Sequence, residues 1–482
     1  MNAAAPDPRR WKALILVCAA IFVVVLDIAI VNVALPSIQE DLHFAERNLQ
    51  WVITAYTLTY GGFLLLGGRA ADLLGRRLFF MIGLALFGSA SLVCGLSTSS
   101  AMLIGARGVQ GLGAAIVSPA ALSIISTTFT EGSERNKALG AWGAVGGSGA
   151  AAGVLLGGIL TKYLGWEWIF FVNVPVAVLV LVLTPIYVRE SKRTDIVHDY
   201  DVTGAVSVTG GLIVLVYAIS QAPDVGWGTF RTIGLLVLAA GALLFFLIWE
   251  GRFAERPLMP LGIFRIRLVA AANLSGLLLA GGMFGTFLLL TLYMQQVLQL
   301  SVLQTGFAFL ATAGTAVVMA GPAQALTTRF GAKPVLVTGM ALLCAGCLWY
   351  TQIDADGSYP KDLLPGFLAV GIGIPFAFIP VTIAALAGVS SDDAGLASGL
   401  INTSQQVGGA IGTAVLSTVA FTHADTLLHQ GTAPPEAFTS GFRWGFWVAA
   451  GIWGAGLIAS AVFIRREEMA HPETVELPAS QT

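Results

Sequence analysis

Two charged residues in otherwise apolar stretches are the first candidates for chemistry in this sequence. Residues 14–36 read LILVCAAIFVVVLDIAIVNVALP, a run long enough to cross a bilayer, with one carboxylate, Asp27, inside it. Arg107 lies inside a second apolar run, SSAMLIGARGVQGLGAAIVSP. A charge at the membrane centre costs about 2.5–3.5 kcal/mol on insertion scales, so each residue must face a partner or a water-filled cavity.

Asp27 and Arg107 are expected at matching depth. The run around Asp27 ends near Pro36, and the run around Arg107 starts near Ser99. At 1.5 Å per residue, both side chains lie about 12–14 Å below the same membrane surface. They could form a functional pair, form a static structural ion pair, or face separate cavities. A carboxylate whose surroundings alternate can take up a proton on one side and release it on the other. Asp27 and Arg107 are therefore the candidates for proton coupling.

A short loop holds the next candidate cluster. Gly75 permits a tight turn, and Asp72 can cap a helix or pair with a basic neighbour. Such a cluster could favour one arrangement of the helices, or the positive charges could simply anchor the topology. The predicted conformational switch consists of Gly68, Asp72, Gly75, Arg76 and Arg77.

Glycines recur along one later apolar run. Small residues on nearly every turn allow close helix packing or bending. Packing is the simpler interpretation, and a hinge is the alternative. The residues are Gly149, Gly153, Gly157 and Gly158.

Polar, aromatic and methionine side chains inside apolar runs could line a greasy, adaptable substrate path. Each could equally serve helix–helix contact. The candidates for substrate binding are Asn32, Tyr56, Gln110, Met283, Phe284, Tyr293 and Gln405.

Composition predicts an all-α polytopic membrane protein. Of the 482 residues, 56% are hydrophobic and 11% are charged, against about 25% charged residues in soluble proteins. We count fourteen apolar runs of spanning length. With the N-terminus inside, nineteen of the 25 Lys and Arg residues fall on the cytoplasmic side and five outside, leaving Arg107 within a span. Both termini are therefore expected in the cytoplasm, and a net charge of −2 predicts no nucleic-acid partner.

Two internal similarities suggest a duplicated bundle. GRAADLLGRRLFF at 68–80 is similar to QALTTRFGAKPVL at 324–336, and GAWGAVGGSGAAAG at 140–153 is similar to GLINTSQQVGGAIG at 399–412. We predict an N-terminal six-helix bundle (1–190), an inserted helix pair with a cytoplasmic linker (191–265), a C-terminal six-helix bundle (266–465) and a disordered cytoplasmic tail (466–482).

Motifs for ATP-driven or enzymatic chemistry are missing from the sequence. It has no P-loop, no H-E-x-x-H and no Gly-x-Ser-x-Gly in a suitable context. The five histidines fall in predicted loops or the tail. We expect that the protein is not an enzyme and has no metal site or cofactor. We expect a proton gradient to be its energy source.

Four motifs carry a resemblance that covers nearly the whole chain. They are Leu26-Asp27-x-x-Ile30-Val31-Asn32-Val33-Ala34-Leu35-Pro36; Gly68-x-x-Ala71-Asp72-x-x-Gly75-Arg76-Arg77; Arg107-Gly108-x-Gln110-Gly111-x-Gly113; and Trp166-x-Trp168-Ile169-Phe170-Phe171-Val172-Asn173-Val174-Pro175. Together they resemble the fourteen-helix drug:proton antiporters of the major facilitator superfamily. The resemblance implies two six-helix bundles plus two inserted helices, and proton transfer involving Asp27 and Arg107.

The resemblance favours a proton-coupled antiporter that exports amphipathic, cationic or neutral drugs or antibiotics by alternating access. We expect it in the cytoplasmic membrane, as a monomer, with protons and lipid as its other partners. Ala150 and Val154 stand where the family's span-5 motif usually has prolines. This difference keeps open an uptake carrier or symporter for a metabolite. A lipid-handling protein on the same fold is a further alternative.

Overall fold

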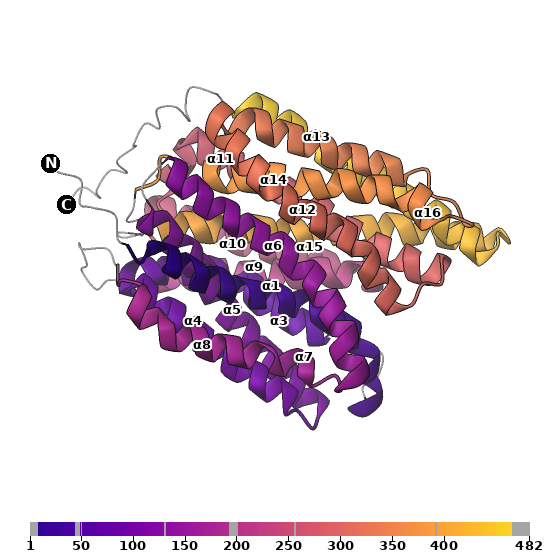
Figure 1. The fold of residues 1–482 in the computed structure, drawn as a ribbon, viewed down its shortest axis with the longest axis horizontal. Coiled ribbons are helices and arrows are strands. Elements are labelled where there is room, and N and C mark those ends of the chain that lie inside the picture. Colours follow the sequence, from indigo (N-terminus) through magenta and orange to yellow (C-terminus); the bar gives the residue numbers. More distant parts are fainter. Residues whose placement is uncertain are drawn as a thin grey trace.

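The computed structural model describes residues 8–43, 49, 51–129, 132–191, 201–254, 257–390 and 393–464. All regular secondary structure within these residues is helical, as predicted. The N-terminal bundle (Figure 1) contains α1 (Arg10–Asp41), α3 (Trp51–Leu74), α4 (Arg76–Gly95), α5 (Ser100–Thr128), α6 (Ser133–Tyr163), α7 (Trp168–Phe171) and α8 (Asn173–Tyr187). The predicted tail at 466–482 lies outside the described residues.

An inserted hairpin and a second bundle follow. The hairpin consists of α9 (Val202–Val225) and α10 (Phe230–Arg252). The short helix η1 (Leu261–Arg265) leads into the C-terminal bundle, which contains α11 (Arg267–Leu292), η2 (Tyr293–Val297), α12 (Val302–Phe330), α13 (Ala332–Tyr350), η3 (Tyr359–Leu363), α14 (Leu364–Leu386), α15 (Ala394–His429) and α16 (Pro434–Phe463).

The number of apolar spans is lower than the fourteen expected. Among the described residues, twelve helical segments are long and apolar enough to cross a membrane. Helices α3 and α6 are not among them, although they have 24 and 31 residues. Both pack against helices of the N-terminal and of the C-terminal bundle. Glycine, threonine and charged residues lower the average apolar character of both helices.

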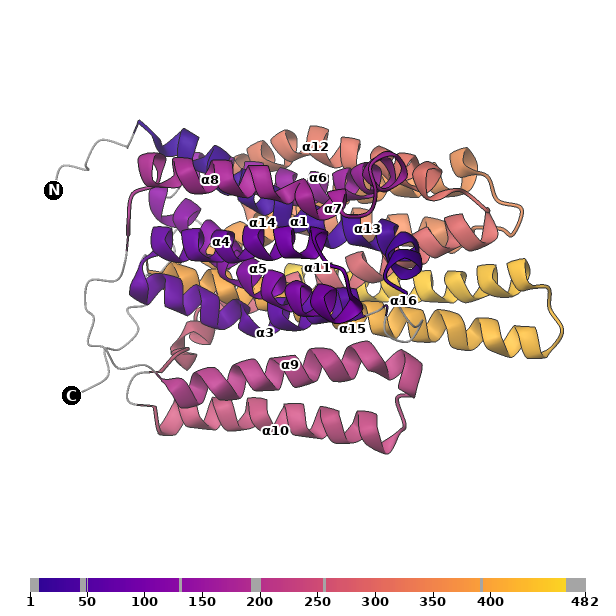
Figure 2. The ribbon, with the colours of Figure 1, turned by 90° about the horizontal axis from the view of Figure 1, so that it is seen from below.

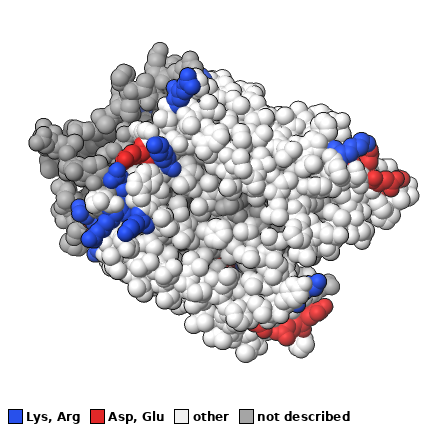
Figure 3. All heavy atoms as spheres, viewed as in Figure 1, with Lys and Arg blue, Asp and Glu red and all other residues white. Residues whose placement is uncertain are grey.

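The two bundles meet along two seams. Helix α6 packs against α12 and α14, and α3 and α5 pack against α15. At the end where α1 begins and α16 ends, the bundles contact each other directly (Figure 1). At the opposite end the bundles diverge, and the surface is notched between them (Figure 3). We call these the closed end and the open end; Lys and Arg gather at the closed end (Figure 3).

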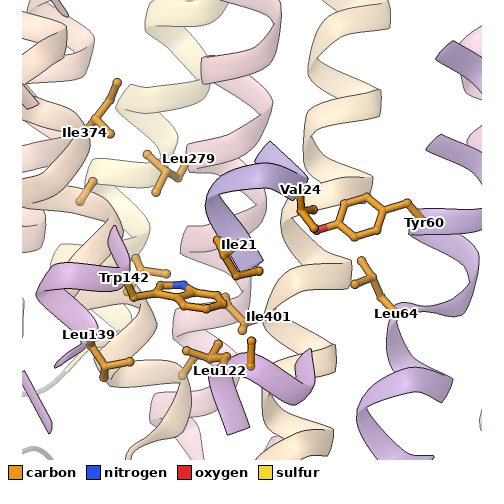
Figure 4. Packing of buried hydrophobic residues seen from close by; sticks show 14 of the residues in the cluster. Ile21, Val24, Tyr60, Leu64, Leu122, Leu139, Trp142, Leu279, Ile374 and Ile401 are labelled. Atoms are coloured by element: carbon orange, nitrogen blue, oxygen red, sulfur yellow. The ribbon is translucent and has the colours of Figure 1, made fainter. Parts of the chain in front are cut away.

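Apolar side chains from both bundles seal the interior between the open and closed ends. In Figure 4, Trp142 of α6 and Ile21 of α1 lie close to Ile401 of α15. All three belong to one continuous buried cluster that also contains Leu122 and Leu279. Removing this area from water and lipid favours the joined state of the bundles.

The inserted hairpin contacts both bundles. Figure 2 shows α9 and α10 lying alongside the rest of the molecule, and α9 packs against α3 and α15. The ring of Trp51 stacks on Tyr217 with centroids 5.9 Å apart, and Trp227 Nε1 donates to Thr418 Oγ1 at 2.8 Å. The hairpin therefore covers one of the two seams between the bundles.

Candidate functional site

Asp27 and Arg107 contact each other directly. Arg107 Nη1 donates to Asp27 Oδ2 at 2.5 Å, and the side chains of Asp27 and Arg107 are 0% and 1% exposed. Ser99 caps the start of helix α5 by accepting from Met102 N, and this helix brings Arg107 to the level of Asp27 in α1. Of the arrangements considered from the sequence, the structure contains the direct ion pair.

Two uncharged side chains also bind Asp27, and a third binds those two. Its Oδ1 accepts from Gln110 Nε2 and from Asn173 Nδ2, both at 2.9 Å. Ser91 Oγ accepts from the same two nitrogens at 3.1 Å and donates to the carbonyl of Phe170 at 2.9 Å. The carboxylate thus sits in a closed network of hydrogen bonds contributed by α1, α4, α5 and α8.

Arg107 has further partners besides Asp27. Its Nε donates to the Val52 carbonyl at 3.0 Å, and its Nη1 also donates to Gln110 Oε1 at 2.6 Å. The ring of Tyr56 lies 4.3 Å from the guanidinium carbon, a cation–π contact. An ion pair this deeply buried is tolerated only when such additional bonds satisfy both charges. A proton added to Asp27 would leave the guanidinium without its counter-charge, so protonation requires the network to rearrange.

The glycine run of α6 lies against the helix that carries Asp27. A Cβ at Gly149 would lie 3.1 Å from Val25 Cβ, and one at Gly153 would lie 2.7 Å from Ala29 Cβ. A Cβ at Gly157 would lie 3.0 Å from the Ile30 carbonyl. These three glycines therefore hold the backbone of α6 close to α1.

Gly158 points elsewhere. A Cβ at this position would lie 3.5 Å from Leu303 Cδ1 of α12, in the other bundle. The glycine run thus contacts α1 on one side and the C-terminal bundle on another.

Asp72 joins the bundles at the closed end. Its Oδ1 and Oδ2 accept from the backbone N–H groups of Gly395 and Leu396, both at 2.9 Å. These groups belong to the first turn of α15, where the helix dipole favours an anion. Arg76 also donates to Asp72 Oδ1, from Nε at 2.9 Å and from Nη2 at 2.6 Å. The sequence predicted a cap or a pair, and Asp72 forms both.

Neighbouring residues extend this contact. Gly68 touches the backbone of Gly395, where a Cβ would not fit. Gly75 has φ of +122°, which explains the need for glycine in this turn. Arg77 pairs with Glu190 at 3.8 Å, and Arg69 pairs with Asp393 of the C-terminal bundle at 3.1 Å. The predicted loop cluster therefore lies at the junction of the two bundles.

The residues predicted to bind substrate fall into two groups. Tyr56, Gln110 and Tyr293 are buried: the first two belong to the Asp27–Arg107 network, and Tyr293 Oη donates to the Asp354 carbonyl at 2.7 Å. The others are exposed or half-buried: Asn32, Met283, Phe284 and Gln405.

Sequence reasoning did not select Ser91, Asn173, Arg69 or Asp393 as functional residues. Asn173 follows a helix break at Val172, because α7 ends at Phe171 and α8 begins at Asn173. An asparagine inside an apolar run is the signal that could have identified it. The described residues contain no group of three or more His, Cys, Asp or Glu side chains placed to hold a metal.

Two joined helical bundles with a buried acid–base pair and an opening at one end define a multi-pass membrane protein with the architecture of a secondary transporter. The Major Facilitator Superfamily profile matches residues 17–413 and 272–481, and the chain belongs to this superfamily of transporters.

Named relatives and a solved structure agree with this family. The chain is 41% identical over 460 residues to the puromycin resistance protein pur8 of Streptomyces alboniger, covering 95% of this chain and 91% of the relative. It is 40% identical over 409 residues to the cephamycin export protein CmcT of Amycolatopsis lactamdurans, covering 84% of each. The human organic anion transporter MFSD10 (TETRAN) shares the fold, with a TM-score of 0.69, 16% identity, and coverage of 95% of this chain and 100% of that one.

Proposed function

We propose that the protein is a proton-coupled antiporter that exports amphipathic drugs or antibiotics by alternating access. Proton coupling is supported by one observation: Asp27 is fully buried, and its only ionic partner among the described residues is Arg107. The export part is supported by relatives named for antibiotic resistance or export. We propose fourteen spans, with α3 and α6 added to the twelve apolar segments.

The closed end is assigned to the cytoplasm in this proposal. Lys and Arg gather there, as the positive-inside rule requires, and α1 begins and α16 ends there (Figures 1 and 3). Both termini are then cytoplasmic, and the open end faces outward from the cytoplasmic membrane. The described arrangement is the state from which a substrate would leave.

Coupling follows from the geometry of the network. In the outward-facing state, a proton entering from outside would neutralise Asp27 and release Arg107 from its counter-charge. The freed guanidinium then favours a different packing of α1 against α5. Return to the inward-facing state would let the proton leave to the cytoplasm while substrate enters. No cofactor is needed, since the proton gradient supplies the energy.

Substrate contact is assigned to the exposed or half-buried candidates Asn32, Met283, Phe284 and Gln405. Methionine and aromatic side chains suit amphipathic molecules of varied shape. We propose a monomer, because one chain contains both bundles and the network.

The test is proton-gradient-driven transport of a fluorescent lipophilic cation in vesicles that contain wild type or Asp27→Asn. We expect efflux by wild type and its loss in the variant. Asp41→Asn is the matched control, since Asp41 lies on the same helix, is exposed, and accepts from Trp166 Nε1 at 3.0 Å. This control should transport like wild type.

Equal transport by wild type and Asp27→Asn would remove Asp27 from the mechanism. Accumulation of the probe, in place of extrusion, would favour an uptake carrier. Binding of lipid without proton exchange would favour a lipid-handling protein.

A further inference from the structure

The base of the α9–α10 hairpin holds two carboxyl groups that the proposed transport mechanism does not use. Asp201 caps α9: its Oδ1 accepts from Gly204 N at 2.7 Å and from Trp249 Nε1 at 2.9 Å. Glu250 lies in the last turn of α10, is 6% exposed, and accepts from Met259 N at 3.4 Å through Oε2. Helix α10 continues to Arg252, so Glu250 is part of the helix.

The remaining oxygens of this pair have no donor among the described residues. Within that part of the chain, Asp201 Oδ2 and Glu250 Oε1 are both buried and lack a hydrogen-bond partner. Both lie beside Gly204: a Cβ there would be 2.8 Å from Glu250 Oε1 and would clash with Asp201 Oδ2. These contacts with the same glycine place the two carboxyl groups next to each other. Two ionised carboxylates could not hydrogen-bond to each other there, because neither has a proton to donate.

The charged surroundings do not compensate a second negative charge. Charged side chains at the closed ends of the packed elements are Arg69 and Asp72 on α3, Arg252 on α10, Arg265 in η1 and Asp393 before α15. Within the described part of the chain, none of them forms an ion pair or hydrogen bond with Asp201 or Glu250. Two neighbouring buried carboxyl groups without a paired cation do not both ionise.

We propose that Asp201 and Glu250 form a proton-binding site, separate from Asp27, that holds one shared proton while the bundles are joined at the closed end. The proton lies between Asp201 Oδ2 and Glu250 Oε1 and satisfies both buried oxygens. When the site opens, the O–H bond breaks, its electrons stay on the carboxylate, and the proton passes to water.

The site is connected to the contact between the bundles. Glu250 accepts from the backbone of Met259, and the Pro257 carbonyl two residues earlier accepts from Arg69 Nη2 at 3.5 Å. Arg69 Nη1 in turn donates to Asp393. Loss of the shared proton adds a charge, drives the two carboxylates apart and shifts this loop. Deprotonation is therefore expected to weaken the closed end.

The first test is infrared difference spectroscopy of the purified full chain across a pH titration. We expect one titrating band from a protonated carboxyl group that is lost in Glu250→Gln and, separately, in Asp201→Asn. Each amide can donate to the remaining carboxylate, which preserves the shape of the pair. Asp362→Asn is the control, because Asp362 is 7% exposed but accepts from Ser358 N at 2.7 Å, and it should keep the band.

Persistence of the full band in both pair variants would overturn the site. Two variants are used so that misfolding of one leaves the result decidable.

The second test measures the closed end. Asn136 Nδ2 of α6 donates to Thr328 Oγ1 of α12 at 3.2 Å, and both are surface positions. In a chain without the native cysteines, Asn136→Cys and Thr328→Cys should cross-link. The cross-linking yield should fall as the pH is raised through the range in which the infrared band disappears. In Glu250→Gln the yield should stay at its low-pH value. The same pH profile with and without Glu250→Gln would overturn the link between this site and the closed end.

Discussion

The Asp27–Arg107 pair offers a quantitative test of the candidate site. In Asp27→Asn, an amide nitrogen replaces the oxygen that accepts from Arg107 Nη1, so two donors face each other and the guanidinium is left buried without a counter-charge. Removing one partner of a buried pair costs about 3–5 kcal/mol in the free energy of unfolding. Arg107→Gln should cost a similar amount, because it strands the carboxylate.

The double variant should be far less costly than the sum of these effects. With both charges gone, Gln110 and Asn173 can still donate to the oxygen of the new amide at position 27. We expect a coupling free energy of about 3 kcal/mol, at the upper end for residues in contact. The measurement is a denaturant titration of all four proteins in the same lipid–detergent micelle.

A matched exposed pair serves as the control. Arg443 and Asp354 lie 2.6 Å apart but are 38% and 60% exposed, so solvent screens their charges. The cycle of Asp354→Asn and Arg443→Gln should give a coupling of at most about 1 kcal/mol. If the costs at Asp27 and Arg107 add to within about 0.5 kcal/mol, the pair is not the coupled unit described here.

Two further predictions concern packing. Gly68→Ala should lower cross-linking of the cysteine pair at the closed end, because the new methyl group would collide with the backbone of Gly395. Gly105→Ala should have no effect, since a Cβ there would meet no atom of a neighbouring helix within 4 Å among the described residues. Tyr56→Phe should leave the free energy of unfolding nearly unchanged, because the hydroxyl has no hydrogen-bond partner among the described residues. Tyr56→Leu should lose the cation–π contact with Arg107, at a cost of about 2 kcal/mol by denaturant titration.

The sequence was sufficient to suggest a contact between Asp27 and Arg107. The helical rise and the membrane boundaries fix the depth of each residue, and a charge in lipid needs a partner. The rotation of α1 about its own axis could not be predicted from the sequence, because this helix is apolar on all sides and no polar face orients it. Sequence reasoning therefore could not tell that Gln110 and Tyr56 belong to the same network as Asp27.

The backbone partners of Asp72 could not be predicted from the sequence either. Asp72 binds the N–H groups of Gly395 and Leu396, which every residue type carries, so no residue pattern marks them. The burial of Glu250 was not predicted from the sequence either. This residue lies in the last turn of α10, and the ends of helices are the least certain part of a sequence-based prediction.

In the proposed transport cycle, a change in the charge of Asp27 must be relayed from one bundle to the contact between the bundles. Helix α6 would provide a direct route. Its glycines from Gly149 to Gly157 touch α1 around Asp27, while a Cβ at Gly140 or at Gly143 would lie 2.9 Å from a side chain of the C-terminal bundle. A displacement of α1 after release of Arg107 would push directly on the backbone of α6, because the glycines have no side chains between the two helices. The motion would then pass through α6 to α12 and α14, and the glycine run would serve both packing and transmission.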